Sequence, residues 1–385
     1  LSKIVTICSE TQTPIVPQGG NTGLCGGATP SADGNQILIS LTRLNQIREV
    51  DPLNYTLTVE AGVILADIQK EAENCDRLFP LSLGAEGTAR IGGNLSTNAG
   101  GTGVLRYGNA RDLVLGIEVV LPNGKILSGL TGLRKDNTGY DLKNLFIGSE
   151  GTLLTITEAE LKLVDKPKYK GLAVIHFDSL IASMEATVSI LELDPSAVEH
   201  VGEIILDEAR KHNEYKKLMD FVDGHPNSLL IVEFTGDSEH ELQGHLDKLK
   251  WKMSSSKLGY HTTIIVDEAE QAKVWAVRRA GLGLMMNVVG DAKPLPFVED
   301  TAVEPHLLPQ FVKRFDEILH NFGTEAGYYG HASVGCLHIR PLINLKESIG
   351  VQQLHDIADE ISSLVLEYGG SISGEHGDGL VRSIW

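Results

Sequence analysis

Residues 83–108 read LGAEGTARIGGNLSTNAGGTGVLRYG, and the fold that we predict is built around this stretch. Eight of its residues are glycines. The small polar residues between them are Thr88, Asn94, Ser96, Thr97 and Asn98. Glycine permits positive φ angles and close approach of a ligand to the main chain, and small polar side chains add hydrogen-bonding groups without bulk. The stretch predicts a loop, a short helix beginning near residues 92–94, and a second loop.

Two further segments have the same composition. Residues 16–30 read VPQGGNTGLCGGATP, and residues 147–156 read IGSEGTLLTI. Three such turns before the middle of the chain indicate one large polar ligand that is contacted at several points. The alternative is that these glycines only make turns. The Gly-x-x-Gly-x-x-Gly pattern of residues 20–26 lacks the strand–helix spacing and the later acidic residue of a dinucleotide-binding Rossmann site.

Length, composition and charge narrow the class of protein. The chain has 385 residues, enough for two or three domains, and its 42% hydrophobic and 22% charged residues are typical of a globular protein. A net charge of −18 argues against a nucleic-acid or anionic-membrane partner, and an anionic substrate would need local arginines and lysines. No apolar run is long enough to predict a transmembrane segment, and no signal peptide is recognised.

The four cysteines are scattered. They are Cys8, Cys25, Cys75 and Cys336, and none forms a Cys-x-x-Cys pair. This spacing argues against an iron–sulfur cluster or a cysteine-rich zinc site within the chain. It favours a reducing compartment, the cytoplasm or, in a eukaryote, the mitochondrial matrix.

Hydrophobic periodicity predicts strands and helices in both halves of the chain. In the first half we expect strands at residues 14–17, 36–41, 55–60, 115–121, 125–127 and 155–163. Residues 4–8 are expected to form the end of one helix, and residues 65–74 a second helix. A small α/β lobe would come first, and a second lobe would begin near Leu81. After a linker at residues 166–168 we expect strands at 172–177, 229–234 and 262–266 and helices at 179–193, 239–253, 268–279, 305–322 and 352–368. The second half therefore predicts a mainly antiparallel sheet backed by helices.

The three glycine-rich segments, together with LRKDNTGYDLKNLFIGSEGT at residues 133–152, resemble one known family. This is the vanillyl-alcohol-oxidase/PCMH flavoprotein superfamily, and within it the D-2-hydroxyacid dehydrogenases that include the D-2-hydroxyglutarate, D-lactate and glycolate-oxidising enzymes. The resemblance implies an α+β fold with a two-lobed PCMH-type FAD-binding domain at residues 1–165. An FAD-linked oxidase C-terminal cap domain would follow at residues 166–385. Family members carry extra elements at both ends, so we expect the chain to be a fragment.

The resemblance implies non-covalent FAD, because no histidine near Asn21 could bond to the flavin. The implied FAD-binding residues are Gln18, Gly19, Gly20, Asn21, Thr22, Gly23, Leu24, Gly84, Thr88, Gly92, Gly93, Asn94, Thr97, Asn98, Glu150, Gly151, Thr152 and Ile156.

Two motifs near the end of the chain carry histidines. Residues 329–341 read YGHASVGCLHIRP, with a turn expected at Gly335, and residues 373–379 read SGEHGDG. Two imidazoles and a carboxylate are a common catalytic zinc set. The resemblance implies that His331, His338 and Glu375 bind a divalent metal, with zinc the expected ion, and that His376 is the base. A structural role is the alternative for each histidine, and Cys336 is either a fourth ligand or a core residue.

Basic residues provide a candidate carboxylate clamp. The resemblance assigns Arg278 and Lys293 to the substrate carboxylate, and Arg340 shares a strand face with His338. Relatives often have asparagine at the position of Arg340. The alternative for Arg278 is a solvated helix face.

The activity that the resemblance implies is oxidation of a D-2-hydroxy acid, D-2-hydroxyglutarate or D-lactate, to the 2-oxo acid. Hydride would pass to flavin N5, and electrons would continue to an external acceptor: an electron-transfer flavoprotein, a quinone or an iron–sulfur protein. Residues 1–165 resemble stand-alone enzymes, whereas the later motifs resemble enzymes fused to an iron–sulfur module, which leaves substrate and acceptor open. The alternatives are an oxidase of another alcohol or sugar, and a non-catalytic FAD-binding fragment or subunit of a larger redox complex with an iron–sulfur partner.

Overall fold

The computed structural model describes residues 1–385, and the chain forms two compact units. Unit 1 is Leu1–Lys166 with Glu375–Ser383, and unit 2 is Pro167–Gly374 with Ile384–Trp385. The chain first passes from unit 1 to unit 2 between Lys166 and Pro167, within the predicted linker at residues 166–168. No pattern in the sequence predicted that Glu375–Ser383 would return to unit 1. None of the helices has both the length and the apolar character that a membrane span requires.

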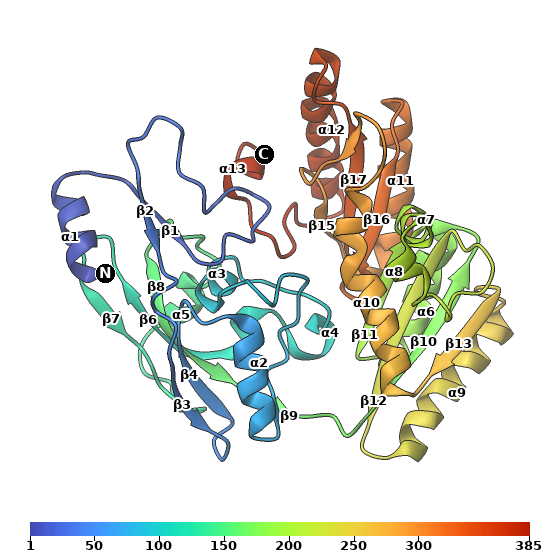
Figure 1. The fold of residues 1–385 in the computed structure, drawn as a ribbon, viewed down its shortest axis with the longest axis horizontal. Helices are drawn as coiled ribbons and strands as arrows, with labels where there is room; N and C mark the ends of the chain where they lie inside the picture. The colour runs from blue at the N-terminus through green and yellow to red at the C-terminus, as the bar shows by residue number, and fades with distance from the viewer. The chain divides into compact units, whose positions relative to one another are not determined.

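Unit 1 is organised by a five-stranded sheet in the order β3-β4-β8-β6-β7 (Figure 1). These strands are β3 (Ile47–Asp51), β4 (Thr56–Glu60), β8 (Thr155–Lys162), β6 (Val114–Val120) and β7 (Ile126–Ser128). Two smaller sheets pair β1 (Ile15–Gln18) with β2 (Ile37–Ser40) and β5 (Arg77–Leu78) with β9 (Val164–Asp165). Strand β4 was expected in the first lobe, yet it pairs with β8 from the second, so one sheet joins both parts of this unit.

The helices of unit 1 are short. They are α1 (Ser2–Glu10), α2 (Leu65–Asn74), α3 (Ile91–Ser96), α4 (Val104–Tyr107), η1 (Ala110–Leu113), α5 (Leu142–Phe146) and α13 (Gly379–Arg382). Helix α2 has the predicted bounds and buries Leu65, Ile68 and Ala72, whose spacing puts them on one face. They join the sheet residues Leu57 and Val59 in one core. Helix α3 confirms the short helix predicted inside the central glycine stretch.

Unit 2 contains an eight-stranded sheet whose pairings are all antiparallel, as predicted. In order along the sheet the strands are β13 (His261–Ile265), β10 (Tyr169–Phe177), β12 (Ser228–Gly236), β11 (Ala197–Gly202), β16 (Ala326–His331), β17 (Cys336–Ile343) and β14 (Lys293–Pro294), and β15 (Asp300–Ala302) also pairs with β17. The helices are α6 (Leu180–Leu191), α7 (Glu203–Lys211), α8 (Asn213–Lys216), α9 (Glu239–Ser256), α10 (Glu268–Met285), η2 (Pro305–Leu307), α11 (Leu308–Asn321), η3 (Ala332–Val334) and α12 (Ser348–Glu367).

Helices cover both faces of this sheet (Figure 1). On one face, Leu172 and Val201 pack with Ile205 of α7 and Val274 of α10. On the other face, α9 lies against β10, where a Cβ at Gly171 would be 3.0 Å from Leu246. All six residues of β11 are therefore buried, including two polar ones, Glu199 and His200.

Burial of His200 makes the stability of unit 2 depend on pH. Its side chain has no solvent exposure, and its Nε2 lies 3.1 Å from Ser228 Oγ. Desolvation, with a smaller contribution from the Arg278 guanidinium, lowers the pKa of His200 to about 3. The unfolded chain has a histidine pKa of about 6.5, so it binds a proton that the folded chain does not. This contribution to stability is complete above the unfolded pKa and is lost as pH falls towards 3.

We expect a His200→Gln variant to have a shallower decline in melting temperature than the parent between pH 6 and pH 4. Glutamine cannot take up the proton, whose linkage contributes up to about 1.4 kcal/mol per pH unit. Thermal unfolding followed by circular dichroism across this range measures the difference. His306→Gln is the matched control, because the His306 side chain is 62% exposed. Parallel curves for His200→Gln and the parent would contradict the assignment.

Candidate functional site

Strand register brings several polar residues into one row on the sheet of unit 2. Tyr329 of β16 pairs with Val201 of β11 on one side and with His338 of β17 on the other. His338 in turn pairs with Asp300 of β15. Residues that are directly opposite in a ladder point to the same face. Tyr329, His338 and Asp300 therefore project on the face that α7 and α10 cover.

The turn between β16 and β17 sets the distance between the two histidines. His331 ends β16, η3 follows, and Gly335 adopts a left-handed conformation with φ 69° before β17 begins. A Cβ at Gly335 would overlap the carbonyl oxygen of Val303. Only glycine satisfies both requirements, which confirms the turn predicted at this residue.

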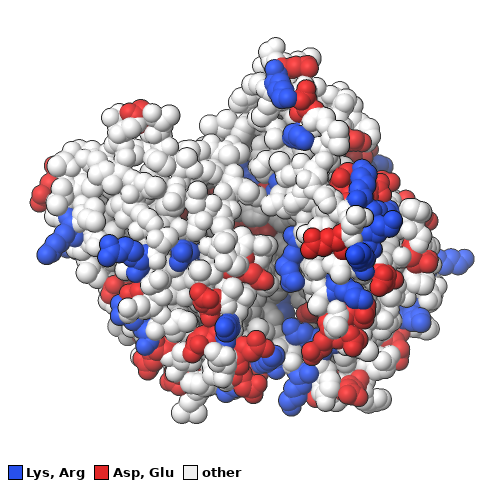
Figure 2. Space-filling view, viewed as in Figure 1, with Lys and Arg blue, Asp and Glu red and all other residues white.

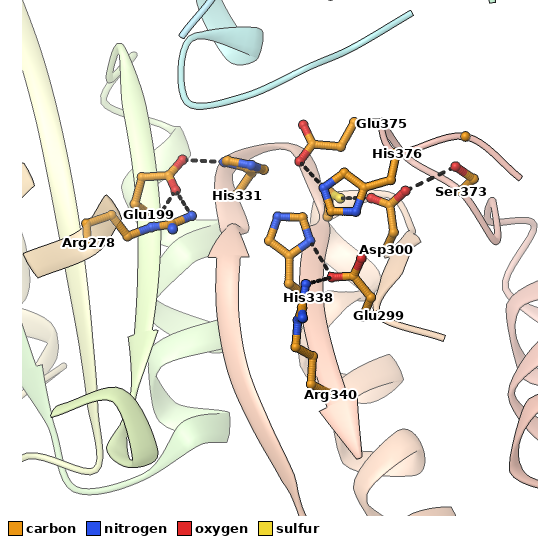
Figure 3. A network of polar contacts seen from close by, with 12 residues as sticks. Glu199, Arg278, Glu299, Asp300, His331, His338, Arg340, Ser373, Glu375 and His376 are labelled. Atoms are coloured by element: carbon orange, nitrogen blue, oxygen red, sulfur yellow. Dashed lines mark hydrogen bonds and ion pairs between the residues drawn. The ribbon is translucent and has the colours of Figure 1, made fainter. Parts of the chain in front are cut away.

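His331 is hydrogen bonded to a buried carboxylate (Figure 3). Its Nδ1 lies 2.8 Å from Glu199 Oε1. The other oxygen, Glu199 Oε2, accepts from Arg278 Nε at 3.0 Å and from Nη2 at 2.6 Å. Arg278 comes from α10 and is 7% exposed, so it does not lie on a solvated helix face. The guanidinium balances the charge of a carboxylate that has no access to solvent.

A second group with the same residue types surrounds His338 (Figure 3). Its Nδ1 lies 3.3 Å from Glu299 Oε2, which also accepts from Arg340 Nη2 at 3.1 Å. The Tyr329 ring is shared by both groups, since its centroid is 5.1 Å from the Arg278 guanidinium carbon and 5.8 Å from that of Arg340. The cluster thus holds two imidazoles, two guanidiniums and two glutamates on one side of the sheet.

Asp300 sits directly beside His338 and is anchored by the end of unit 2. Its Oδ2 accepts from Ser373 Oγ at 3.0 Å, and its main-chain oxygen accepts from Gly374 N at 2.7 Å. The Cys336 Sγ is buried 3.6 Å from Asp300 Oδ1. Glu375 and His376 are the next two residues of the chain after the anchored Gly374.

Three further predicted residues of this part are Lys293, Glu375 and His376. Lys293 is opposite Ile343 in the β14–β17 ladder, and its Nζ donates to Val288 O at 2.6 Å. Glu375 and His376 open the segment that belongs to unit 1, with His376 Nε2 3.5 Å from Glu375 Oε1. Within unit 1, a Cβ at Gly100 would overlap Glu375 Oε2.

The glycines of unit 1 divide into two groups. A Cβ at Gly20 would overlap Thr88 O, and a Cβ at Gly92 would be 2.7 Å from Ala61 Cβ, so these two glycines allow close packing of the backbone. By contrast, a Cβ placed at Gly23, Gly84 or Gly93 meets nothing within 4 Å apart from its chain neighbours and, for Gly93, the backbone of its own helix. These segments leave main chain accessible, as a cradle for a large polar cofactor requires.

Glu150, one of the predicted FAD-binding residues, has a structural partner. It adopts φ 51°, and its carboxylate accepts from the main-chain nitrogens of Asp378 at 2.9 Å and Gly379 at 3.0 Å. The Leu380 nitrogen donates to Cys25 O at 2.7 Å. The carboxyl-terminal segment is thus fastened to two of the three glycine-rich turns.

The surface charge visible on one face of the molecule is mixed. On the face shown in Figure 2, acidic and basic side chains are interspersed, without a continuous basic tract. This agrees with the net charge of −18.

Comparison with known proteins identifies the family. Residues 166–385 match the family described as "FAD linked oxidases, C-terminal domain", and residues 1–129 match the "FAD binding domain" family. The chain belongs to the FAD-linked oxidase family. It is therefore an FAD-linked oxidoreductase of the group that contains the 2-hydroxyacid dehydrogenases, as the sequence motifs predicted.

Three relatives of this FAD-linked oxidase match nearly all of it. The glycolate oxidase subunit GlcD of Bacillus subtilis (strain 168) is 32% identical over 100% of this chain and 79% of that protein. The mitochondrial D-2-hydroxyglutarate dehydrogenase of Danio rerio is 33% identical over 99% of this chain and 70% of that protein. The D-lactate dehydrogenase of Anaerostipes hadrus is 31% identical over 98% of this chain and 79% of that protein.

A solved structure supports the fold. Substrate-bound p-cresol methylhydroxylase superposes with a TM-score of 0.75 over 97% of this chain and 79% of that chain, at 19% sequence identity. The likeness confirms the α+β architecture of this FAD-linked oxidase.

Sequence reasoning missed three acidic residues of the cluster: Glu199, Glu299 and Asp300. Glu199 lies in a stretch, residues 194–228, to which we assigned no element. The signal that could have found it is the Glu–His pair inside the short apolar run AVEHVG. Two titratable residues within a buried strand indicate specific polar partners. Glu299 and Asp300 follow Phe297 and Val298 in the same way.

Proposed function

We propose that this FAD-linked oxidase converts a D-2-hydroxy acid, D-2-hydroxyglutarate or D-lactate, into the 2-oxo acid. The observation that carries the proposal is the row of side chains in unit 2, where two imidazoles and two buried arginines share one face of the sheet. Imidazoles suit the alcohol end of such a substrate, and guanidiniums suit its carboxylate. The names of the three relatives describe the same class of substrate.

In this proposal Arg278, Arg340 and Lys293 bind and orient the substrate carboxylate. Arg340 is 1% exposed, and its Nε has no hydrogen-bond partner. A buried donor of this kind is costly unless something accepts from it, so a carboxylate ligand would be stabilised there. Lys293 bonds to a carbonyl oxygen rather than to a carboxylate, so its charge is not balanced by an acidic partner.

The alcohol end of the substrate is assigned to His331, His338 and Glu375 as ligands of a divalent cation, expected to be zinc. Their imidazole and carboxylate donors fit such an ion, and Asp300 beside His338 is a further oxygen donor. A bound divalent cation lowers the pKa of a coordinated hydroxyl. His376 would take the hydroxyl proton as general base.

The FAD-binding role falls to the glycine-rich segments of unit 1, from Gln18 to Ile156. Bound there, FAD would supply the redox chemistry of the reaction, as the acceptor of hydride from C2 of the substrate and the donor of electrons to an external acceptor. The residues of the chain bind the cofactor through main-chain N–H groups and orient it. They form no covalent bond to it, because no histidine lies within these segments.

Anaerobic absorbance spectra of the purified protein during titration with D-2-hydroxy acids test the proposal. D-2-hydroxyglutarate, D-lactate and glycolate should be compared with the L enantiomers of the first two. We expect bleaching of the oxidised flavin band by at least one D enantiomer and not by its mirror image. Flavin-containing protein that none of these acids bleaches would contradict the proposed substrate class.

We expect a Gly93→Ala variant to bind FAD at least about tenfold more weakly than the parent. A Cβ there meets nothing within 4 Å apart from its chain neighbours and the backbone of its own helix, so the apoprotein should keep its melting temperature while the methyl group obstructs the cofactor. Fluorescence titration of deflavinated protein with FAD measures the affinity. Gly244→Ala is the control, because Gly244 in α9 also has nothing within 4 Å and lies in unit 2. Equal FAD affinity in the parent and in Gly93→Ala would contradict the assignment of Gly93.

A second candidate function is that of a non-catalytic FAD-binding subunit of a larger redox complex with an iron–sulfur partner. The Bacillus subtilis relative is named a subunit, which favours this alternative. Protein that is purified yellow and turns over none of the hydroxy acids would support it.

A further inference from the structure

Both histidines of the cluster make contact with a carboxylate through the same ring nitrogen. The pairs are His331 Nδ1 with Glu199 Oε1 at 2.8 Å, which is a hydrogen bond, and His338 Nδ1 with Glu299 Oε2 at 3.3 Å, which is within ion-pair distance but does not have hydrogen-bond geometry. Each glutamate is fully buried, and each also binds an arginine from a different element, Arg278 from α10 and Arg340 from β17. Both groups include the Tyr329 ring, and they have the same residue types.

We propose that Glu199 and Glu299 are positioning residues that hold His331 and His338 in the Nδ1–H tautomer. This inference rests on the proposed function, in which the two imidazoles bind a cation, and adds the residues that orient them. Neither glutamate would touch the substrate or the cofactor.

The chemical reason is that the hydrogen-bonding capacity of the carboxylate is shared between an arginine and a histidine. An ionised carboxylate only accepts hydrogen bonds, and a neutral imidazole has one donor nitrogen and one acceptor nitrogen. Arg278 takes Oε2 of Glu199 and balances its charge, which leaves Oε1 to accept from His331. Nδ1 must then carry the proton, and the lone pair resides on Nε2. A metal ion binds that lone pair, and the carboxylate increases the basicity of the ring.

The arginines have a second role in this arrangement. A buried glutamate without a counterion would be expensive, and a histidine alone would not balance it. Because Arg278 and Arg340 each lie beside the Tyr329 ring and against a glutamate, they are the counterions of the two carboxylates in a place that solvent does not reach. This accounts for two arginines that are already bound to carboxylates at a site proposed for an anionic substrate.

Nitrogen NMR of the full-length protein labelled with ¹⁵N-histidine and stripped of metal tests the inference directly. The His331 and His338 signals are assigned by their loss in His331→Asn and His338→Asn. We expect the proton of each ring on Nδ1 in the parent protein. A proton on Nε2 of His331 would overturn the inference, and this measurement needs neither a variant of Glu199 nor catalytic turnover.

A metal titration supplies the second measurement. Co²⁺ alone is added to the apo form of the parent, Glu199→Gln and Glu299→Gln, and its visible absorption reports the affinity. We expect about 10–100-fold weaker binding in each variant, the usual cost of losing such a partner. Glu233→Gln is the matched control, because Glu233 is a partly buried glutamate on the neighbouring strand β12, and burial already raises its pKa. Unchanged Co²⁺ affinity in Glu199→Gln and Glu299→Gln would overturn the inference.

The outcomes separate this inference from the proposed function. Nδ1–H tautomers and weakened Co²⁺ binding, without flavin bleaching by any D-2-hydroxy acid, would remove the substrate assignment and leave the positioning roles intact. If a D-2-hydroxy acid bleaches the flavin but the imidazoles carry their protons on Nε2, the substrate assignment stands and the positioning roles are removed.

Discussion

Replacing Arg278 with methionine is expected to destabilise unit 2 by about 3–5 kcal/mol, the typical cost of removing one partner of a buried ion pair. Methionine fills similar volume but leaves the Glu199 carboxylate, which has no solvent exposure, without its counterion. Urea unfolding monitored by tryptophan fluorescence measures the change. Arg279→Met is the matched control, because Arg279 is the next residue of α10 and is exposed.

A double variant decides whether charge is the cause. Glu199→Gln combined with Arg278→Met removes both charges, so it should be more stable than Arg278→Met alone. If the double variant is less stable than the parent by the sum of the two single-variant effects, then lost packing rather than an uncompensated carboxylate explains the result.

Replacing His376 with alanine is expected to slow flavin reduction by a D-2-hydroxy acid by a factor of about 10²–10⁴, the range for loss of a general base. FAD content should be unchanged. The chain places His376 two residues after the Gly374 nitrogen that is anchored to Asp300. Anaerobic stopped-flow measurement of flavin reduction, with the acid that bleaches the parent, gives the rate. His320→Ala serves as the control, because its side chain is 69% exposed on α11.

Two results would refute the base assignment for His376. One is a reduction rate in His376→Ala within a few-fold of the parent. The other is a loss of reduction rate that is as large at high pH as at neutral pH, because hydroxide at high pH can replace a missing base. Reduction that recovers as pH rises would agree with the proposed role.

The sequence was most informative where a local rule operates. Helix α2 followed from apolar spacing within its ten residues, and the turn at Gly335 followed from a glycine between two predicted strands. The glycine-rich segments predicted the family, which the comparisons confirmed. The assignment of individual residues to FAD, metal and substrate remains a prediction.

The sequence was least informative where pairing is long-range. Nothing near Glu199 in the sequence indicates that His331, which is far along the chain, will contact one of its carboxylate oxygens. Nor does it indicate that α10 will bring Arg278 to the other oxygen. A fully buried strand has no alternation of polar and apolar residues to reveal it, and β11 was missed for that reason.

The sequence by itself determined the family, the antiparallel cap and the set of residue types available for chemistry, because glycine turns and hydrophobic periods are properties of neighbouring residues. Only the tertiary structure decided that Glu199 and Glu299 each serve one histidine and one arginine, and that Glu375–Ser383 returns to unit 1. Sheet register and burial create those partnerships, and both depend on residues that the folded chain brings together from distant positions.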